Sequence, residues 1–580
     1  MIGLFRKKRP YSEQAQFLEK YLSAYRQNIH LPATLRVSEL ESMHCSFCSS
    51  LHRRAQAREP DVSAFLYAAL RLPDCVSHAG RVLLGPAEDV FAKAGFPGVE
   101  GWIQVKSRAR RRRYHYDGDQ TLAVFVTSVT DLDDLIPSLC AFQIEWNKMH
   151  RLLNPGSPDF TLGRALAAGQ TNAAKAGQEI RRSLGLARSD WELLTQVWAD
   201  DWDRKWSDVA GAPLDLVVYR LPLHDGYFEK AAQQWWDMVS CRVDLESASS
   251  GGRPLYLVSS NTHSLANLIT GFARTHETEL LTFLERENQE DLWRVWQDCQ
   301  RDPEQNPADL LYYGLRLYEE RYPSQVSARL IREESMGFHR HAPVQYPHLE
   351  VQRIALSRLD PSCLDSRLQW APSLARSQAL LVNIDYPLGL AAGHVLASAC
   401  ERFPGLRGVF ILGKSAAAIG RLGDIIIPSH VYDSHTQTRY LFQNSLNVRH
   451  LVPFLNRIAA FDDQKTITAH GTFLHGREVV SHLLQDDFTG VEMEAGPFLR
   501  ALHRHFSRQE LVQCMGNRGV LNIKTPQDFN LGILHYTSDT PYNIRPSLLS
   551  TRLGMTGLEA VYASSLAILQ RIMDLEAKKL

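Results

Sequence analysis

Hydrophobic and polar positions follow two different patterns along the chain. Up to about residue 345, many apolar residues recur every three or four positions, as at Leu132, Leu135 and Leu139, which is the spacing of a helix that buries one face. From about residue 349 onward, short apolar runs alternate with helical segments, a pattern typical of parallel strands joined by helices. We therefore expect an α/β domain with parallel strands, preceded by a mostly helical α+β region.

These patterns divide the chain into three parts. Residues 1–155 are expected to form an α+β region, residues 156–345 a helical region rich in tryptophan, and residues 346–580 the α/β domain, with 337–348 as the linker before it. Within the second part, 254–272 is expected to form a strand, a loop of small polar residues and a helix. Such a loop can bind an anion or nucleotide, and its Ser and Asn residues can equally cap the helix, so both interpretations stay open.

Composition and charge exclude several classes of protein. The 580 residues carry 64 basic and 64 acidic side chains, and this balance removes the global electrostatic argument for binding to nucleic acid or to a membrane surface. We expect the basic run 106–113 to be a solvated face, and we expect no nucleic-acid partner. No apolar stretch approaches the roughly 20 residues that cross a membrane. The nine cysteines are scattered and no secretory signal precedes them, so we expect a cytoplasmic protein.

Two local patterns are explained without a ligand. Cys45 and Cys48 have the C-x-x-C spacing of a zinc site, but no second Cys/His pair follows at the required distance, so we expect no metal and no cofactor. Three tryptophans at helical spacing predict a packing seam on one helix face. They are Trp198, Trp202 and Trp206.

Small and polar residues follow the apolar runs of the last domain. The predicted strand 379–384 ends at Asp385, and the predicted strand 408–412 enters a loop of small residues in which a substrate can approach the backbone closely. That loop begins with Gly413, Lys414 and Ser415. Four further segments follow in order: Gly423–Pro428 (Gly-Asp-Ile-Ile-Ile-Pro), Gly471–Leu474, Gly490–Gly496 (Gly-Val-Glu-Met-Glu-Ala-Gly) and Leu531–Thr540, which contains Ser-Asp.

Taken together and in this order, these segments resemble the purine nucleoside phosphorylase and nucleosidase superfamily. The resemblance covers about 230 residues and says nothing about the chain before about residue 345. It implies a phosphorylase-like α/β fold for 346–580, with a central mixed sheet flanked by helices. It also implies an N-glycosidase or pentosyltransferase activity on a purine nucleoside or nucleotide, and a homo-oligomer. The preceding region is then expected to be regulatory.

The resemblance also implies roles for individual side chains. Cleavage of a ribose–purine bond passes through an oxocarbenium-like sugar, so a site needs an acid for the leaving base and a carboxylate for the ribose. Asp539, in the Ser-Asp pair with Ser538, is expected to be the general acid at purine N7. Glu494 is expected to accept hydrogen bonds from the ribose hydroxyls, with Met493 packed on the sugar. Phe473 is expected to contact the base.

The nucleophile is left open between water and inorganic phosphate. The first loop offers Asp385 and no Arg, which favours a nucleosidase that activates water. Lys414 and Ser415 stand where relatives have mostly Gly, Thr or Ser, and a Lys there can bind phosphate as a co-substrate or as part of a nucleotide. Because this loop is poorer in glycine than the family pattern, an inactive protein that senses nucleotides or acts as a scaffold is the alternative.

Overall fold

The computed structural model describes most of the chain. The described ranges are 11–155, 162–198, 201–242, 252–287, 292–301, 307–342, 346–477, 480–481, 485–507, 519–541 and 555–580. The chain forms two compact units, and neither is one continuous stretch of sequence. The first unit comprises 1–227, 469–487 and 541–549, and the second comprises 228–468, 488–540 and 550–580.

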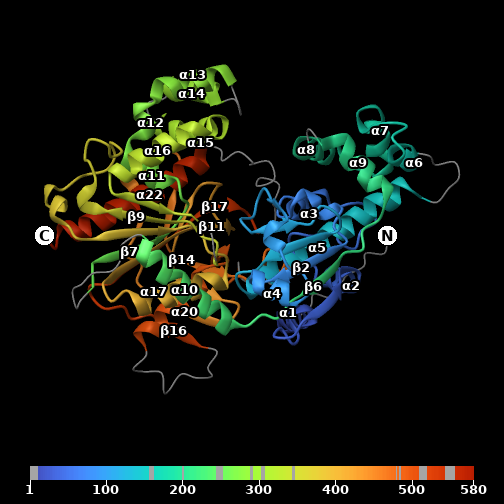
Figure 1. The fold of residues 1–580 in the computed structure, drawn as a ribbon, viewed down its shortest axis with the longest axis horizontal. Coiled ribbons are helices and arrows are strands. Elements are labelled where there is room, and N and C mark those ends of the chain that lie inside the picture. The colour runs from blue at the N-terminus through green and yellow to red at the C-terminus, as the bar shows by residue number, and fades with distance from the viewer. Residues whose placement is uncertain are drawn as a thin grey trace. The chain divides into compact units, whose positions relative to one another are not determined.

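The first unit is built on a six-stranded mixed sheet (Figure 1). Its strand order is β1 (Ala33–Arg36), β6 (Val217–Arg220), β2 (Arg81–Gly85), β5 (Thr121–Phe125), β4 (Tyr114–Tyr116) and β3 (Ile103–Val105). The three central strands β6, β2 and β5 are parallel. The helices are α1 (Tyr11–Arg26), α2 (Val37–Phe47), α3 (Val62–Ala69), α4 (Glu88–Lys93), α5 (Val129–Leu153), α6 (Leu162–Ala167), α7 (Ala173–Ser183), α8 (Arg188–Trp198) and α9 (Trp202–Gly211).

Two sequence predictions about this unit have different outcomes. The predicted packing of the tryptophans is confirmed, because Trp198, Trp202 and Trp206 contact one another with ring centroids 5.1–5.9 Å apart. Their predicted place on one helix face is wrong, because Trp198 is the last residue of α8 and Trp202 is the first residue of α9. The prediction of a solvated basic face is wrong at its centre. Arg110 and Arg112 form ion pairs with buried carboxylates of α5. The N–O distances are 2.6 Å from Arg110 to Asp134 and 2.7 Å from Arg112 to Asp131. Those guanidinium groups are therefore used inside the unit.

The second unit contains a larger mixed sheet of eleven strands. Ten strands lie in the order β16 (Val520–Asn522), β13 (Thr438–Leu441), β12 (Ile425–Asp433), β14 (Ala460–Thr468), β15 (Phe488–Glu492), β11 (Leu406–Ala417), β7 (Leu255–Ser259), β10 (Leu380–Ile384), β9 (Val351–Ala355) and β8 (Phe338–His341). The eleventh strand, β17 (Asn530–Asp539), pairs with both β11 and β12. This second pairing closes β11, β15, β14, β12 and β17 into a ring of five strands.

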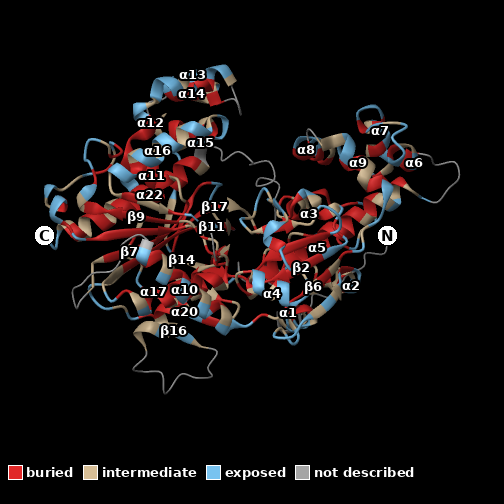
Figure 2. Cartoon of the chain, in the orientation of Figure 1, coloured by how far each residue is buried: buried red, intermediate tan, exposed pale blue. Residues whose placement is uncertain are grey.

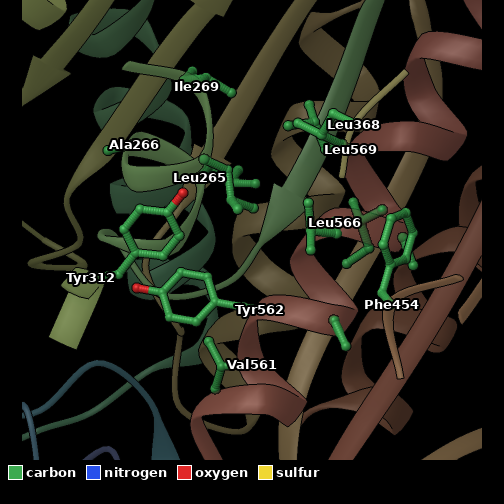
Figure 3. Close-up of a cluster of buried hydrophobic side chains, with 14 of the residues drawn as sticks. Leu265, Ala266, Ile269, Tyr312, Leu368, Phe454, Val561, Tyr562, Leu566 and Leu569 are labelled. Atoms are coloured by element: carbon green, nitrogen blue, oxygen red, sulfur yellow. The ribbon is translucent and has the colours of Figure 1, made fainter. Parts of the chain in front are cut away.

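Helices cover both faces of this sheet, and its strands are mostly buried (Figures 1 and 2). On one face lie α10 (Asp225–Arg242), α17 (Leu390–Arg402) and α20 (Ala495–Phe506). On the other lie α11 (Ser264–Thr270), α15 (Pro307–Arg321), α16 (Pro323–Ser335) and α22 (Met555–Ala577). Figure 3 shows part of the core on that side, where Leu265, Tyr312 and Tyr562 pack together. The remaining helices are α12 (Phe272–Thr275), α13 (Glu277–Glu287), α14 (Leu292–Arg301) and α18 (Val448–Leu451).

The division into units differs from the predicted boundary at residue 345. Strand β7, predicted to precede the α/β domain, is a central strand of its sheet and pairs in parallel with β10 and β11. The predicted linker 337–348 contains the edge strand β8. The first difference arises because the hydrogen bonds of a parallel strand such as β7 go to residues far away in the sequence, and local hydrophobic patterns do not reveal those partners. No helix among the described residues is long and apolar enough to cross a membrane.

Candidate functional site

Two of the motifs identified in the sequence meet at one end of the five-stranded ring. Ala416, near the end of β11, pairs with Val491 of β15 on one side and with Asp539 of β17 on the other. Because neighbouring strands lie about 4.8 Å apart, Val491 and Asp539 are separated by roughly 10 Å. The segment Val491–Glu494 and the candidate acid Asp539 therefore flank the same short stretch of β11.

The register places Asp539 beside a β-bulge. Ser415 pairs with Thr537 and the next residue, Ala416, pairs with Asp539, so Ser538 is the extra residue on β17. Bulges re-aim side chains and are frequent beside active sites. Both Ser538 and Asp539 are only partly buried, which is compatible with contact with a ligand at this end of the ring.

Glu492, the last residue of β15, holds the turn into α20. Its side chain is almost fully buried, and its Oε2 accepts hydrogen bonds from the backbone N–H groups of Glu494 and Ala495, both at 2.6 Å. The hydroxyl of Thr468, at the end of β14, donates to the other oxygen, and the Gly496 N–H donates to that hydroxyl at 2.8 Å. This network connects the ends of β14 and β15 and fixes the backbone of Glu494.

Glu494 itself faces the loop that follows β10. Its Oε1 accepts a hydrogen bond from the backbone N–H of Gly389 at 3.3 Å. Gly389 has a φ of 53°, a region that favours glycine, and it directly precedes α17. Asp385 starts the same loop, is partly buried, and accepts the Tyr386 N–H at 3.0 Å through its Oδ1. The loop carrying Asp385 and the carboxylate of Glu494 therefore meet. Met493, between the two glutamates, is 8% exposed.

The prediction of a loop of small residues from Gly413 onward is wrong, because strand β11 continues to Ala417. Hydrogen-bonding partners on both sides, β17 and β15, keep this stretch extended. A Cβ on Gly413 would lie 2.8 Å from the His535 ring, so the glycine makes room for that buried histidine. Ser415 is 1% exposed, and its hydroxyl donates to the Val491 carbonyl at 3.2 Å. Lys414 is exposed.

Phe473 lies elsewhere than predicted. It belongs to the first unit, is fully buried, and contacts the rings of His44, His52 and Tyr67 with centroids 5.5–6.3 Å apart. A base-contacting side chain needs an accessible face, whereas this ring is covered by those neighbours. We therefore correct its assignment to a core residue. Its apolar character was visible in the sequence, but the unit to which it belongs was not.

His44 and His52 also have structural partners. Their imidazoles share a hydrogen bond of 2.9 Å, and His52 contacts Glu145 at 2.7 Å. The thiol of Cys45 donates to a backbone carbonyl. In the loop after β7, ligand binding and helix capping were both left open by the sequence. There the Asn261 Oδ1 accepts hydrogen bonds from the backbone N–H groups of His263 and Ser264, so this side chain caps the start of α11.

Sequence reasoning missed Glu492 and Thr468. Glu492 stands inside the Val-Glu-Met-Glu-Ala motif. Because side chains alternate along a strand, its side chain points to the opposite face from Val491, and this alternation could have identified it. Thr468 had no signal, because its partner is 24 residues away.

Glu492 gives a prediction about stability. Burial, together with the nearby Glu494 carboxylate, raises the pKa of Glu492 to about 8. A carboxyl group whose pKa is raised in the folded state stabilises the fold fully below its unfolded pKa and loses that contribution as pH rises through about 8. Glu492→Gln is therefore expected to gain stability relative to the natural protein between pH 5 and pH 8, by roughly a few kcal/mol. Urea midpoints across this pH range measure the difference. Equal pH slopes for the two proteins would contradict the assignment.

Comparison with known proteins gives a family and several similar structures. A family model described as "Family of unknown function (DUF6909)" matches residues 37–574. No curated protein sequence matches the chain.

Among solved structures, the chain is similar to a 5′-methylthioadenosine/S-adenosylhomocysteine nucleosidase from Neisseria meningitidis, with 12% identity and a TM-score of 0.27 over 42% of this chain and 94% of that one. It is similar to an S-adenosylhomocysteine nucleosidase from Streptococcus pyogenes, with 8% identity and a TM-score of 0.27 over 56% and 98%. It is also similar to a methylthioadenosine phosphorylase from an Antarctic soil metagenomic library, with 8% identity and a TM-score of 0.26 over 35% and 73%.

Proposed function

Because the chain belongs to DUF6909, a family of unknown function, its activity has to be argued from its own side chains, and we propose that it hydrolyses the N-glycosidic bond of a purine nucleoside or nucleotide. The observation that carries this proposal is the pairing of Ala416 with Val491 on one side and Asp539 on the other. Asp539 and a motif with two carboxyl groups are thereby held at one end of a closed ring of strands.

The proposed roles follow from the charge that develops during the reaction. As the C1′–N9 bond breaks, its electron pair passes to the purine and the sugar becomes oxocarbenium-like. Asp539 gives a proton to N7 of the leaving base, so that the base departs neutral. Glu494, on the other side of β11, accepts hydrogen bonds from the ribose hydroxyls, and its negative charge stabilises the cationic sugar. Met493 packs against the sugar.

Water is the proposed nucleophile, because the candidate phosphate ligands on β11 are poorly suited to bind an anion. The Ser415 hydroxyl already donates to the Val491 carbonyl. Lys414, its neighbour on the strand, points to the opposite face of the sheet by the alternation of side chains. Asp385 starts the loop whose Gly389 N–H reaches Glu494, and there its carboxylate takes a proton from water as the water oxygen bonds to C1′.

The test is an assay for free purine base. The protein is incubated with adenosine, inosine, AMP and ATP, each with and without inorganic phosphate, and products are separated by chromatography. We expect base and free ribose or ribose phosphate to appear at the same rate with and without phosphate. A strict requirement for phosphate, with ribose 1-phosphate as product, would replace hydrolysis with phosphorolysis.

A failure to release base distinguishes the enzyme from a protein that only binds nucleotides. Tight binding of a purine nucleotide without any product would contradict the enzyme and support a nucleotide-sensing or scaffold protein instead. The observation that favours this second candidate is the continuous strand through Lys414 and Ser415. The pattern of the purine nucleoside phosphorylase and nucleosidase superfamily has a glycine-rich loop at this place. Equilibrium dialysis with the same four purine compounds separates it from a protein that binds none of them.

A further inference from the structure

The connection between β14 and β15 follows an unusual path. These two strands are parallel neighbours in the second unit, with Thr468 paired to Glu492. Parallel neighbours need a crossover, and a crossover normally packs on its own sheet. Here the connecting residues, 469–487, belong to the first unit.

The first nine residues of this crossover are firmly held in the first unit. Phe473 is fully buried and Leu474 is 4% exposed. The backbone is tied as well: the Ser50 N–H donates to the His475 carbonyl at 2.7 Å, and the Arg477 N–H donates to the Cys48 carbonyl at 3.3 Å. We call residues 469–477 the anchored segment.

Side chains of α5 add to this anchoring. The Thr472 hydroxyl donates to Asp134 at 3.5 Å, and the His470 ring lies 3.9 Å from a carboxylate oxygen of Asp133. A Cβ on Gly471 would lie 2.5 Å from the Asp133 carbonyl, so this glycine is required by the close approach of two backbones. The anchored segment is therefore fitted into the core of the first unit.

The crossover begins at the candidate site. Thr468, the residue directly before the crossover, donates a hydrogen bond to Glu492 at the end of β15, and the Glu492 side chain accepts the backbone N–H of Glu494. The anchored segment thus begins one residue after a hydrogen-bonding partner of the site.

We propose that Phe473 is a positioning residue: by holding the anchored segment in the first unit, it fixes the end of β14 and, through the hydrogen bond from Thr468 to Glu492, orients Glu494. This inference rests on the proposed function for the role of Glu494 in binding ribose. It assigns the first unit a regulatory task, because whatever loosens the core around Phe473 also loosens the carboxylate end of β15. The coupling travels along the covalent chain to Thr468 and from there through hydrogen bonds to Glu492 and Glu494.

The test is hydrogen exchange in the full chain without substrate, measured on a peptide that contains residues 490–496. The amides of Glu494, Ala495 and Gly496 donate to Glu492 and Thr468, so their exchange reports on the site. Phe473→Ala is expected to speed their exchange by about tenfold or more, because local opening becomes easier. Phe473→Leu, which keeps most of the apolar volume, is expected to give a smaller increase, and it serves as the main variant if the alanine variant does not fold.

Phe91→Ala is the matched control. Phe91 is also fully buried in the first unit, but it packs on Phe125 in a cluster that includes no residue of the crossover. Faster exchange at 490–496 in the Phe473 variants and not in Phe91→Ala supports the proposal. Unchanged exchange in the Phe473 variants, or an equal increase in Phe91→Ala, overturns it. None of these outcomes requires turnover. If the protein cleaves no nucleoside, the proposed function is refuted, but the hydrogen-exchange comparison still tests the role of Phe473. Where base release is observed, Phe473→Leu is expected to raise KM more than it lowers kcat.

Discussion

Replacement of Asp539 by asparagine is expected to slow release of the purine base by about 10²–10⁴-fold, which is the contribution that a positioned general acid makes. Asparagine has nearly the same shape and keeps a hydrogen-bond donor, but it cannot give up a proton to N7. Substrate binding should therefore change much less than kcat. Single-turnover measurements of base release, together with KM, separate the two effects.

Asp528→Asn is the control for this substitution. Asp528 is exposed and lies two residues before β17 begins, whereas Asp539 ends that strand. The same change of charge at the opposite end of the strand should leave kcat near that of the natural protein. If Asp539→Asn retained full activity, the leaving base would have to be protonated by another group, and the proposed mechanism would be wrong.

The second large effect is expected at Glu494. A hydrogen bond to a charged group contributes about 1.5–3 kcal/mol, so Glu494→Gln should lower kcat/KM for a ribonucleoside by roughly 10–150-fold. Glutamine keeps the acceptor oxygen that meets the Gly389 N–H, so the loop before α17 should keep its position. Steady-state kinetics on the preferred substrate measures the loss.

Substrate analogues identify the partner of Glu494. Removing the 2′-hydroxyl from the substrate should penalise the natural protein strongly and the Glu494→Gln variant only slightly, because the variant has already lost most of that interaction. An equal penalty in both proteins would show that Glu494 does not bind the 2′-hydroxyl. Glu401→Gln, an exposed position near the end of α17, controls for a change in surface charge.

The sequence located the strands that carry the candidate site with good accuracy. The predicted strand 379–384 is β10, and the strand predicted to end in Ser-Asp is β17. Continuous apolar runs bounded by polar residues are a local property, and a strand buried on both faces needs such a run. Asp385 and Asp539 stand where two of these runs end, whereas Glu494 was selected from the order of the motifs.

Errors arose where distant partners decide the conformation. Residues 413–417 are mostly small and suggested a loop, yet they form a strand because β15 and β17 supply hydrogen bonds on both sides. Phe473 sits in a crossover whose two flanking strands belong to one unit and whose apolar side chains are buried in the other. Hydrophobicity predicted that Phe473 is covered, and it carried no information about which neighbours cover it.

By itself, the sequence determined that apolar runs such as 380–384 and 531–536 become strands, because residue type and apolar runs are local properties of the chain. Only the tertiary structure decided that β7 joins the second unit, that β17 closes the ring, and that the anchored segment is buried in the first unit. These are choices among partners far apart in the sequence. Their free energy comes from surfaces that exist only after the chain has folded.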